Sequence, residues 1–201
     1  MVTALALNCT LKPSPAASSS ELLAQQVLDA LAEHGVEGGE IVRVVDHDVK
    51  PGVEADMGDG DAWPDIREKV LAADILVFAT PTWMGHMSSV AQRVLERLDA
   101  EISETDDAGR PLLAGKVAVC AVVGNEDGAH AIIADAYQGL VDVGFSVPSF
   151  GSVYWNGEAM QTVDYNDLAE TPEKVADATA MVARHAAHLA TVLSTQPYPA
   201  P

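Results

Sequence analysis

The stretch from Asp74 to Ser89 limits most strongly how this chain can fold. Residues 75–79, Ile-Leu-Val-Phe-Ala, form an unbroken apolar run rich in β-branched and aromatic residues. Such a run is typical of a strand covered on both faces, as in a parallel sheet. Pro81 ends the run, because proline cannot donate to a sheet ladder. We therefore expect a central strand followed by a loop from Pro81 to Ser89.

The rest of the chain alternates between short apolar runs and segments of helical periodicity. Further strands are expected at 2–8, 39–45 and 116–123, with an irregular edge strand within 145–154 that contains Pro148 and Gly151. Helices are expected to begin at Ser18, at Trp63, at Ser88 or Ser89, after the turn 124–128, and at Thr171. The alternation predicts an α/β fold in three layers, a five-stranded parallel sheet of order 2-1-3-4-5 with helices on both faces. We expect a single domain over residues 1–194 and a flexible C-terminal tail over 195–201.

That strand order has a functional consequence. It creates a switch point between the first and third strands, and in open α/β sheets ligands bind beyond the carboxyl ends of the strands at such a point. The loops 10–20 and 81–89 should therefore meet and form one pocket. The alternative for 81–89 is an ordinary connection that only caps a helix.

The first of these loops has the composition of an anion site. It offers the hydroxyls of Thr10, Ser14, Ser18, Ser19 and Ser20 and ends where a helix begins, at free N–H groups that attract phosphates. Lys12 is the only Lys or Arg in the first 42 residues. A Ser-rich and Pro-rich loop can also be a simple solvated connection. Residues 8–12 contain no glycine, which excludes a dinucleotide-binding Gly-x-Gly-x-x-Gly turn.

Charge and composition exclude several classes of protein. The net charge of −19 argues against binding to nucleic acid or to anionic membranes, because both need a basic patch. No apolar run approaches the roughly 20 residues that cross a bilayer, so we expect a cytoplasmic protein. The 2 cysteines, Cys9 and Cys120, cannot build a disulfide framework or an iron–sulfur ligand set.

Three segments together resemble the flavodoxin-like flavoproteins, and within them the NAD(P)H-dependent FMN reductase family. They are the first loop ending in Ser18-Ser19-Ser20, the loop from Pro81 to Ser88, and residues 124–130, Gly-Asn-Glu-Asp-Gly-Ala-His. The resemblance extends over nearly the whole chain. It implies a flavodoxin-like fold with bound FMN, and NADH or NADPH as the electron donor.

The resemblance also implies which residues bind FMN. The first loop would bind the phosphate, the second would lie along the isoalloxazine ring, and the third would contact the far side and polar edge of the ring. The implied phosphate ligands are Thr10, Lys12, Ser18, Ser19 and Ser20. The implied ring neighbours are Pro81, Thr82, Trp83, Met84 and Gly85 from the second loop, and Asn125, Glu126, Asp127, Gly128 and His130 from the third.

Several of these side chains also have simpler interpretations. Trp83 could cover the edge of the sheet, and Trp155 could be a ring neighbour, a core residue or an anchor between subunits. His86 and His130 could be solvent-facing, or could form hydrogen bonds with the flavin or a substrate. We expect no metal site, because no helical His pair with a third ligand is present.

Two function classes, and a third outcome, follow from this sequence. The first is an FMN-dependent oxidoreductase that passes electrons from NAD(P)H through FMN to a small acceptor, either free flavin or a quinone. Hydride transfer needs no protein nucleophile or base, so we assign no catalytic residue. The second is a flavodoxin-type electron carrier, which the acidic charge favours. The third is a cofactor-free binding module on the same fold.

The long segments 46–65 and 151–170 distinguish the first two classes. They exceed what a minimal carrier needs, so they could form a wall of a substrate site or a subunit interface. The family resemblance further implies a homodimer or homotetramer. The sequence does not choose between NADH and NADPH, and it does not identify the acceptor.

Overall fold

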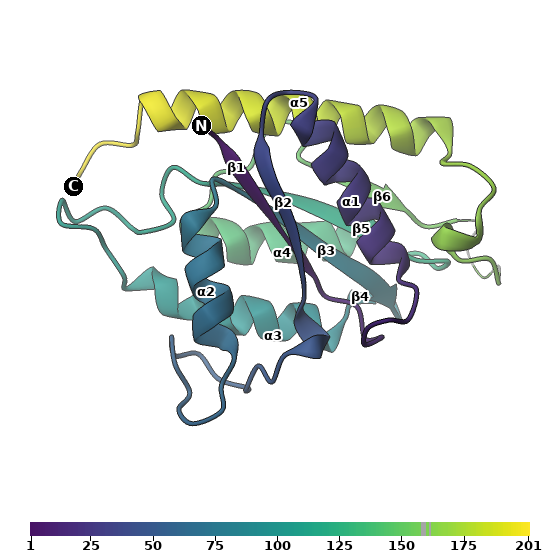
Figure 1. Ribbon diagram of the computed structural model, residues 1–201, viewed down its shortest axis with the longest axis horizontal. Coiled ribbons are helices and arrows are strands. Elements are labelled where there is room, and N and C mark those ends of the chain that lie inside the picture. The colour runs from purple at the N-terminus through teal and green to yellow at the C-terminus, as the bar shows by residue number, and fades with distance from the viewer. Residues whose placement is uncertain (158–159, 161) are drawn as a thin grey trace.

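The computed structural model describes residues 1–157, 160 and 162–201 and has an α/β fold, in which helices cover a mostly parallel sheet (Figure 1). The strands are β1 (Thr3–Asn8), β2 (Glu37–Arg43), β3 (Ile75–Trp83), β4 (His86–Met87), β5 (Val117–Val123) and β6 (Ser152–Trp155). The α-helices are α1 (Ser19–Ala32), α2 (Trp63–Ala72), α3 (Ser89–Leu98), α4 (Ala129–Asp142) and α5 (Glu173–Thr195). Short 3₁₀ turns lie at Val44–Asp46, Asp99–Ile102 and Tyr165–Asp167.

The sheet confirms the predicted topology. Its strands lie in the order β2-β1-β3-β5-β6 and pair in parallel, and β4 is a short antiparallel addition to β3. β3 is central, since Val77 lies beside Ala6 of β1 and beside Val119 of β5. Apart from β4, this is the order 2-1-3-4-5. β6 is short and lies at an edge, as Pro148 and Gly151 indicated.

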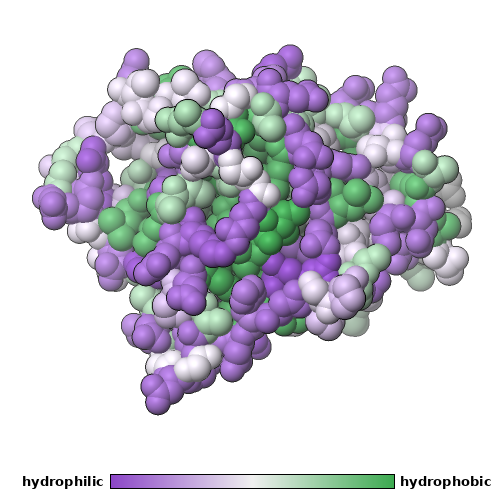
Figure 2. All heavy atoms as spheres, viewed as in Figure 1, coloured by the Kyte–Doolittle hydropathy of each residue, from purple (hydrophilic) through white to green (hydrophobic). Residues whose placement is uncertain are grey.

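Helices cover the sheet on both faces. α1 and α5 lie against one face, and α2, α3 and α4 lie against the other (Figure 1). Figure 2 shows hydrophilic residues over most of one side of the molecule, with hydrophobic residues gathered mainly towards the middle. The face shown is therefore largely polar, as expected for a chain of net charge −19.

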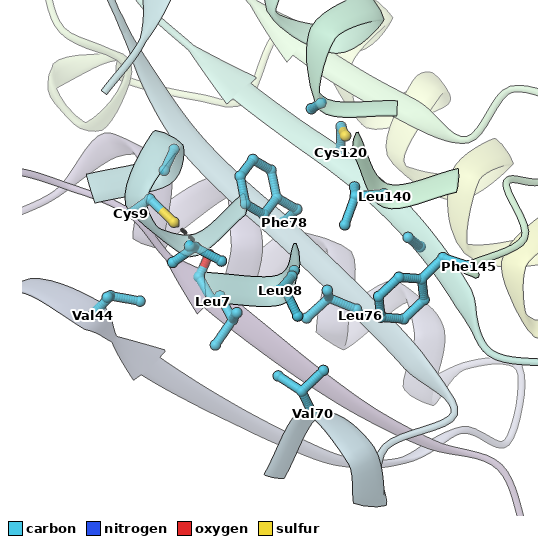
Figure 3. Packing of buried hydrophobic residues seen from close by; sticks show 14 of the residues in the cluster. Leu7, Cys9, Val44, Val70, Leu76, Phe78, Leu98, Cys120, Leu140 and Phe145 are labelled. Atoms are coloured by element: carbon cyan, nitrogen blue, oxygen red, sulfur yellow. Dashed lines mark hydrogen bonds between the residues drawn. The ribbon is translucent and has the colours of Figure 1, made fainter. Parts of the chain in front are cut away.

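The side chains of β3 alternate between two hydrophobic cores. Leu76 and Phe78 point towards α2, α3 and α4, where they pack with Leu98 and Leu140 (Figure 3). Ile75, Val77 and Ala79 point the other way, towards α1 and α5. All of these β3 side chains are almost completely buried. This double burial explains why the strand is apolar at every position rather than at alternate ones.

β3 extends further than the sequence predicts. It continues through Pro81 to Trp83 and then turns at Met84-Gly85 into β4. At Pro81 only β5 accompanies β3, because β1 ends at Asn8 and β4 pairs only with Thr82 and Trp83, and proline is tolerated where a strand loses a neighbour. Met84 and Gly85 both have positive φ, +53° and +77°, as a tight two-residue hairpin requires.

Two of the expected helix caps are present and one is not. Ser18 accepts a hydrogen bond from the backbone of Glu21 and Ser88 accepts one from Ala91, so both begin helices as predicted. Thr171 does not cap α5, because Pro172 occupies the N-cap position. The Thr171 hydroxyl instead accepts a hydrogen bond from Gln26 on α1 and connects the two helices.

A buried ion pair anchors the long connection between β2 and α2. The side chains of Arg97 on α3 and Asp61 are both completely buried, with Nη2 and Oδ2 2.8 Å apart. Arg97 also donates to the backbone carbonyls of Lys50 and Glu54 and lies over the ring of Trp63. Burial alone would raise the pKa of the Asp61 carboxyl, but hydrogen bonds from Arg97 and from backbone N–H groups hold that pKa well below its usual value.

We expect Asp61→Asn to lower the free energy of unfolding by about 3 to 5 kcal/mol, because it leaves the Arg97 charge buried without a counter-ion. Denaturant-induced unfolding would measure the change. Asp59→Asn is the matched control, since Asp59 is an exposed acid of the same connection and its loss should cost less than about 0.5 kcal/mol.

The same pair predicts how stability depends on pH. A carboxyl with a lowered pKa stabilises the fold above its unfolded-state value of about 3.9 and loses that effect as the pH falls through the folded-state value. The wild type should therefore lose more stability than Asp61→Asn between about pH 5 and pH 2. If the free energies of unfolding of the two proteins fell equally over this pH range, Asp61 would not be the source of the pH dependence.

Candidate functional site

A pocket opens at the carboxyl ends of β1, β3 and β5, at the switch point that the strand order predicts. It brings together the first loop (residues 9–18) with the start of α1, the end of β3, the β5–α4 loop (residues 124–128) and the connection from β6 to α5. The lining residues are Thr10, Leu11, Lys12, Ser18, Ser19, Ser20, Pro81, Thr82, Trp83, Val123, Gly124, Asn125, Trp155, Asp164 and Tyr165.

The hydroxyl groups of the first loop gather around one buried amide. Asn8, the last residue of β1, accepts hydrogen bonds through Oδ1 from the Thr10 backbone at 3.2 Å and from the Ser20 hydroxyl at 2.8 Å. The Ser18 and Ser20 hydroxyls lie 3.1 Å apart. Asn8 Nδ2 is buried and has no hydrogen-bond partner within the described residues. Asn8 thus holds the loop against the start of α1.

A buried arginine supports the same loop from below. Arg43, at the end of β2, donates through Nη1 to the backbone carbonyls of Ala16 at 2.8 Å and Lys12 at 3.3 Å. Its Nη2 is paired with the carboxylate of Glu21 in the first turn of α1. The guanidinium therefore fixes the loop and balances the acid at the helix start. The only sign of this role in the sequence is a lone Arg at the end of an expected strand.

The far side of the first loop is attached to Asp46. The Ser14 backbone N–H and hydroxyl donate to the two carboxylate oxygens of Asp46, at 2.8 and 2.5 Å. These hydrogen bonds from Ser14 lower the pKa of the Asp46 carboxyl. The Ser14 hydroxyl is therefore occupied, and it does not line the pocket with the other hydroxyls.

The end of β3 forms the opposite wall. Pro81, Thr82 and Trp83 line the pocket, and half of the Trp83 surface is exposed. Thr82 Oγ1 is buried and has no hydrogen-bond partner within the described part of the chain. An added Cβ on Gly124 would lie 2.7 Å from Thr82 Cβ, so glycine at that position keeps this wall compact.

The β5–α4 loop supports the tip of the β3–β4 hairpin. Glu126 accepts a hydrogen bond from the Met84 backbone N–H at 2.9 Å, and Gly128 packs directly against Gly85. Asp127 accepts a hydrogen bond from the backbone of Gly128. Asn125 alone of the residues predicted from this loop lines the pocket.

The remaining predicted residues lie outside the pocket lining. They are Met84, Gly85, Glu126, Asp127, Gly128 and His130. The first five shape the hairpin tip and its support. His130 Nε2 lies 3.1 Å from the hydroxyl of Tyr154, with the two rings edge to face. His86 belongs to the hairpin, where it pairs with Trp83.

Sequence reasoning missed Asp164 and Tyr165, which line the pocket from the connection after β6. Trp155, one of whose three interpretations was a ring neighbour, lines the pocket with its ring centroid 5.4 Å from that of Tyr165. Asp164 also lines it. The segment 151–170 therefore forms a wall, as far as its described residues extend, whereas 46–65 contributes no lining residue. The pocket is also lined by Leu11, Val123 and Gly124, which the sequence marks only as neighbours of predicted site residues.

The donor set of the pocket suits a phosphorylated flavin. The Thr10 hydroxyl, Lys12 and the start of α1 provide donors for a phosphate, and the buried Thr82 Oγ1 has no partner among the described residues. The Ser19 and Ser20 hydroxyls donate to Asn166 and Asn8, so they would have to rotate to donate to a phosphate. Trp83, Trp155 and Pro81 offer apolar surfaces for a flat ring. Burial raises the pKa of the Cys9 and Cys120 thiols, so neither is a ready nucleophile. Among the described residues no cluster of His, Cys, Asp or Glu could hold a metal ion.

An open parallel sheet of this order, with its pocket at the switch point, defines the flavodoxin-like class, and solved flavodoxins share the fold. Residues 2–159 match the sequence profile of the NADPH-dependent FMN reductases, and the chain belongs to that family. Members of the family use FMN with a nicotinamide electron donor.

Individual relatives agree with this assignment. The crystal structure of RosB with bound 8-demethyl-8-formylriboflavin-5'-phosphate superposes with a TM-score of 0.88 at 32% identity, over 98% of this chain and 82% of that one. The 8-demethyl-8-aminoriboflavin-5'-phosphate synthase of Streptomyces davaonensis is 36% identical over 165 residues, 78% of this chain and 64% of that protein.

A further relative is much longer than this chain. The divalent metal cation transporter MntH of Mycobacterium bovis is 37% identical over 168 residues, 82% of this chain but 24% of that protein. This chain therefore spans less than two thirds of the length of either curated relative. In the part of the chain that the structure describes, no helix has the length and apolar character needed to cross a membrane.

We expect Gly128→Ala to lower the free energy of unfolding by about 2 kcal/mol more than Gly115→Ala. Both glycines have positive φ, +141° and +93°, so both substitutions strain the backbone. Only at Gly128 would the new Cβ meet neighbouring backbone, 2.7 Å from Gly85, whereas nothing lies within 4 Å at Gly115. Thermal or denaturant unfolding of the two variants would measure the difference, and equal losses would contradict the packing of the hairpin on the loop.

Proposed function

We propose that this protein binds FMN in the pocket and acts as an NAD(P)H-dependent flavin oxidoreductase. The observation that carries the proposal is the convergence of a hydroxyl-rich loop at a helix start with aromatic walls at the switch point. Thr10, Lys12, Ser18, Ser19 and Ser20 would hold the phosphate. Membership of the FMN reductase family supports the same assignment.

The ring would be held by the walls of the pocket. We assign Pro81, Thr82, Trp83 and Asn125 to direct contact, because they line it, and Trp155 joins them. Met84, Gly85, Glu126, Asp127 and Gly128 would act by shaping the hairpin tip beside the ring. We do not assign His130 to the ring contacts, because its imidazole is hydrogen-bonded to Tyr154, outside the pocket lining.

FMN held by these residues would supply the redox chemistry of an oxidoreductase, with NADH or NADPH as the electron donor and free flavin or a quinone as the small acceptor. The protein's own residues bind and orient. The hydroxyls and Lys12 would fix the phosphate end of FMN, and the apolar side chains would exclude water from one side of its ring. Trp83, which is half-exposed, would leave space beside the ring for a second molecule, the donor or the acceptor. No lining side chain is needed as an acid, base or nucleophile.

The direct test is a visible spectrum of the purified protein with and without added FMN, followed by NADH or NADPH in the absence of oxygen. We expect bound flavin to lose its yellow colour with at least one nucleotide, which also identifies the donor. A bound flavin that stays yellow would favour an electron carrier. A protein that binds no FMN would contradict the proposal.

Replacing Lys12 should weaken binding of the phosphate specifically. We expect Lys12→Ala to raise the dissociation constant for FMN on the order of tenfold, and to change that for riboflavin by less than about twofold, since riboflavin lacks the phosphate. Quenching of flavin fluorescence measures both constants. Lys69→Ala is the control, because Lys69 pairs with Glu40 on the surface and lies outside the pocket lining. Equal losses for the two ligands would contradict a phosphate role.

A second candidate function is supported by the relatives. The RosB structure, at 32% identity, holds a riboflavin-5'-phosphate altered at position 8, and the Streptomyces davaonensis relative, at 36% identity, is named as the synthase of such a compound. In this version FMN is a substrate whose ring is modified, rather than a permanent cofactor. Incubation with FMN, followed by chromatography and mass measurement of the released flavin, separates the two: an unchanged flavin supports the reductase, and a changed mass supports flavin modification.

A further inference from the structure

One wall of the pocket comes from a segment beyond the part of the chain that matches the family profile. That match ends at residue 159, whereas Asp164 and Tyr165 line the pocket and Asn166, next in the chain, is hydrogen-bonded to Ser19 at the start of α1. We call residues 164–166 the crossing segment. Because it lies outside the matched residues, its role cannot be taken from the family.

The crossing segment is held firmly in place. Tyr165 is buried, its ring packs against Trp155, and its hydroxyl donates to Gln26 on α1 at 2.7 Å. The backbone N–H of Asn166 donates to the Ser19 hydroxyl at 3.3 Å, and the Ser19 hydroxyl is also bonded to the Asn166 side chain. These contacts fix the backbone on either side of Asp164 and so fix where its side chain can reach.

The carboxylate of Asp164 lies between Asn125 and Lys12 in the pocket. Its Oδ1 accepts a hydrogen bond from Asn125 Nδ2 at 3.2 Å, and its Oδ2 lies 4.0 Å from Lys12 Nζ. Asn125 belongs to the ring side of the pocket and Lys12 to the phosphate side. A half-exposed pair at 4.0 Å holds Lys12 only weakly, so the lysine remains able to bind a phosphate.

We propose that Asp164 is a specificity-determining residue that accepts hydrogen bonds from the hydroxyl groups of the ligand's polyol chain. The proposal rests on the proposed function, since it assumes FMN in this pocket. A carboxylate is only an acceptor, and its spare lone pairs suit hydroxyl donors between a phosphate and a ring. The site should therefore prefer flavins with a hydroxylated side chain over flavins without one.

The test compares three flavins that differ in one feature each. FMN carries ring, polyol and phosphate, riboflavin lacks the phosphate, and lumiflavin lacks the polyol as well. We expect Asp164→Ala to raise the dissociation constants for FMN and riboflavin about tenfold, the loss typical of a hydrogen bond to a charged group, and to leave lumiflavin within about twofold. Fluorescence quenching gives all three constants.

Two further variants make the result specific. Asp164→Asn keeps a carbonyl acceptor in the same place, so it should lose less, about threefold for FMN and riboflavin. Asp167→Ala removes the same charge from an exposed position in the same 3₁₀ turn and should change no constant by more than about twofold. Thermal unfolding of each variant confirms that it is folded.

Other results would overturn the proposal. Equal weakening of all three flavins by Asp164→Ala would make Asp164 a structural part of the wall. Tighter binding of FMN by that variant would make Asp164 a competitor of the phosphate for Lys12. Failure of the wild type to bind any of the three flavins would instead remove the proposed function, and this inference with it.

Discussion

The site depends on one feature of the sheet, the divergence of the chain after β1 and β3. These strands are neighbours, but β1 leads to α1 on one face and β3 leads to α3 on the other. Neither of these two connections fills the space between the strand ends. Asn8 closes the bottom of that space by holding the first loop, and β3 extends beyond Asn8 to form a wall. Every lining residue is positioned with reference to these two strand ends.

Much of the fold could be predicted because it rests on local patterns. The apolar runs at β3 and β5 indicate strands buried on both faces, and Ser18 and Ser88 indicate helix starts. Parallel pairing with alternating helices then limits the strand order to few solutions. The departures were local as well: β3 continues through Pro81 because β1 has already ended, and Thr171 serves α1 rather than capping α5.

The site could be predicted less completely, because part of it depends on contacts between distant residues. Hydroxyl residues just before a helix can be recognised from the sequence as a candidate anion site. The roles of Arg43 and Asp164 cannot, because Arg43 binds backbone carbonyls 27 and 31 positions away and Asp164 binds an amide 39 positions away. In a chain of net charge −19, the few acidic residues that lie at a site also cannot be distinguished by sequence from the many that face solvent.

The crossing segment has a consequence for how such a protein can diversify. It pairs with no strand and lies between the last strand and the last helix, so its sequence contributes to the ligand site without contributing to the sheet. Substitution of Asp164 can alter which ligand is preferred while the strands stay as they are, whereas Tyr165 also belongs to the core under α1 and α5. The two sides of the site thus differ: the first loop is tied to two strand ends through Asn8 and Arg43, whereas the half-exposed side chain of Asp164 can be replaced without disturbing a strand.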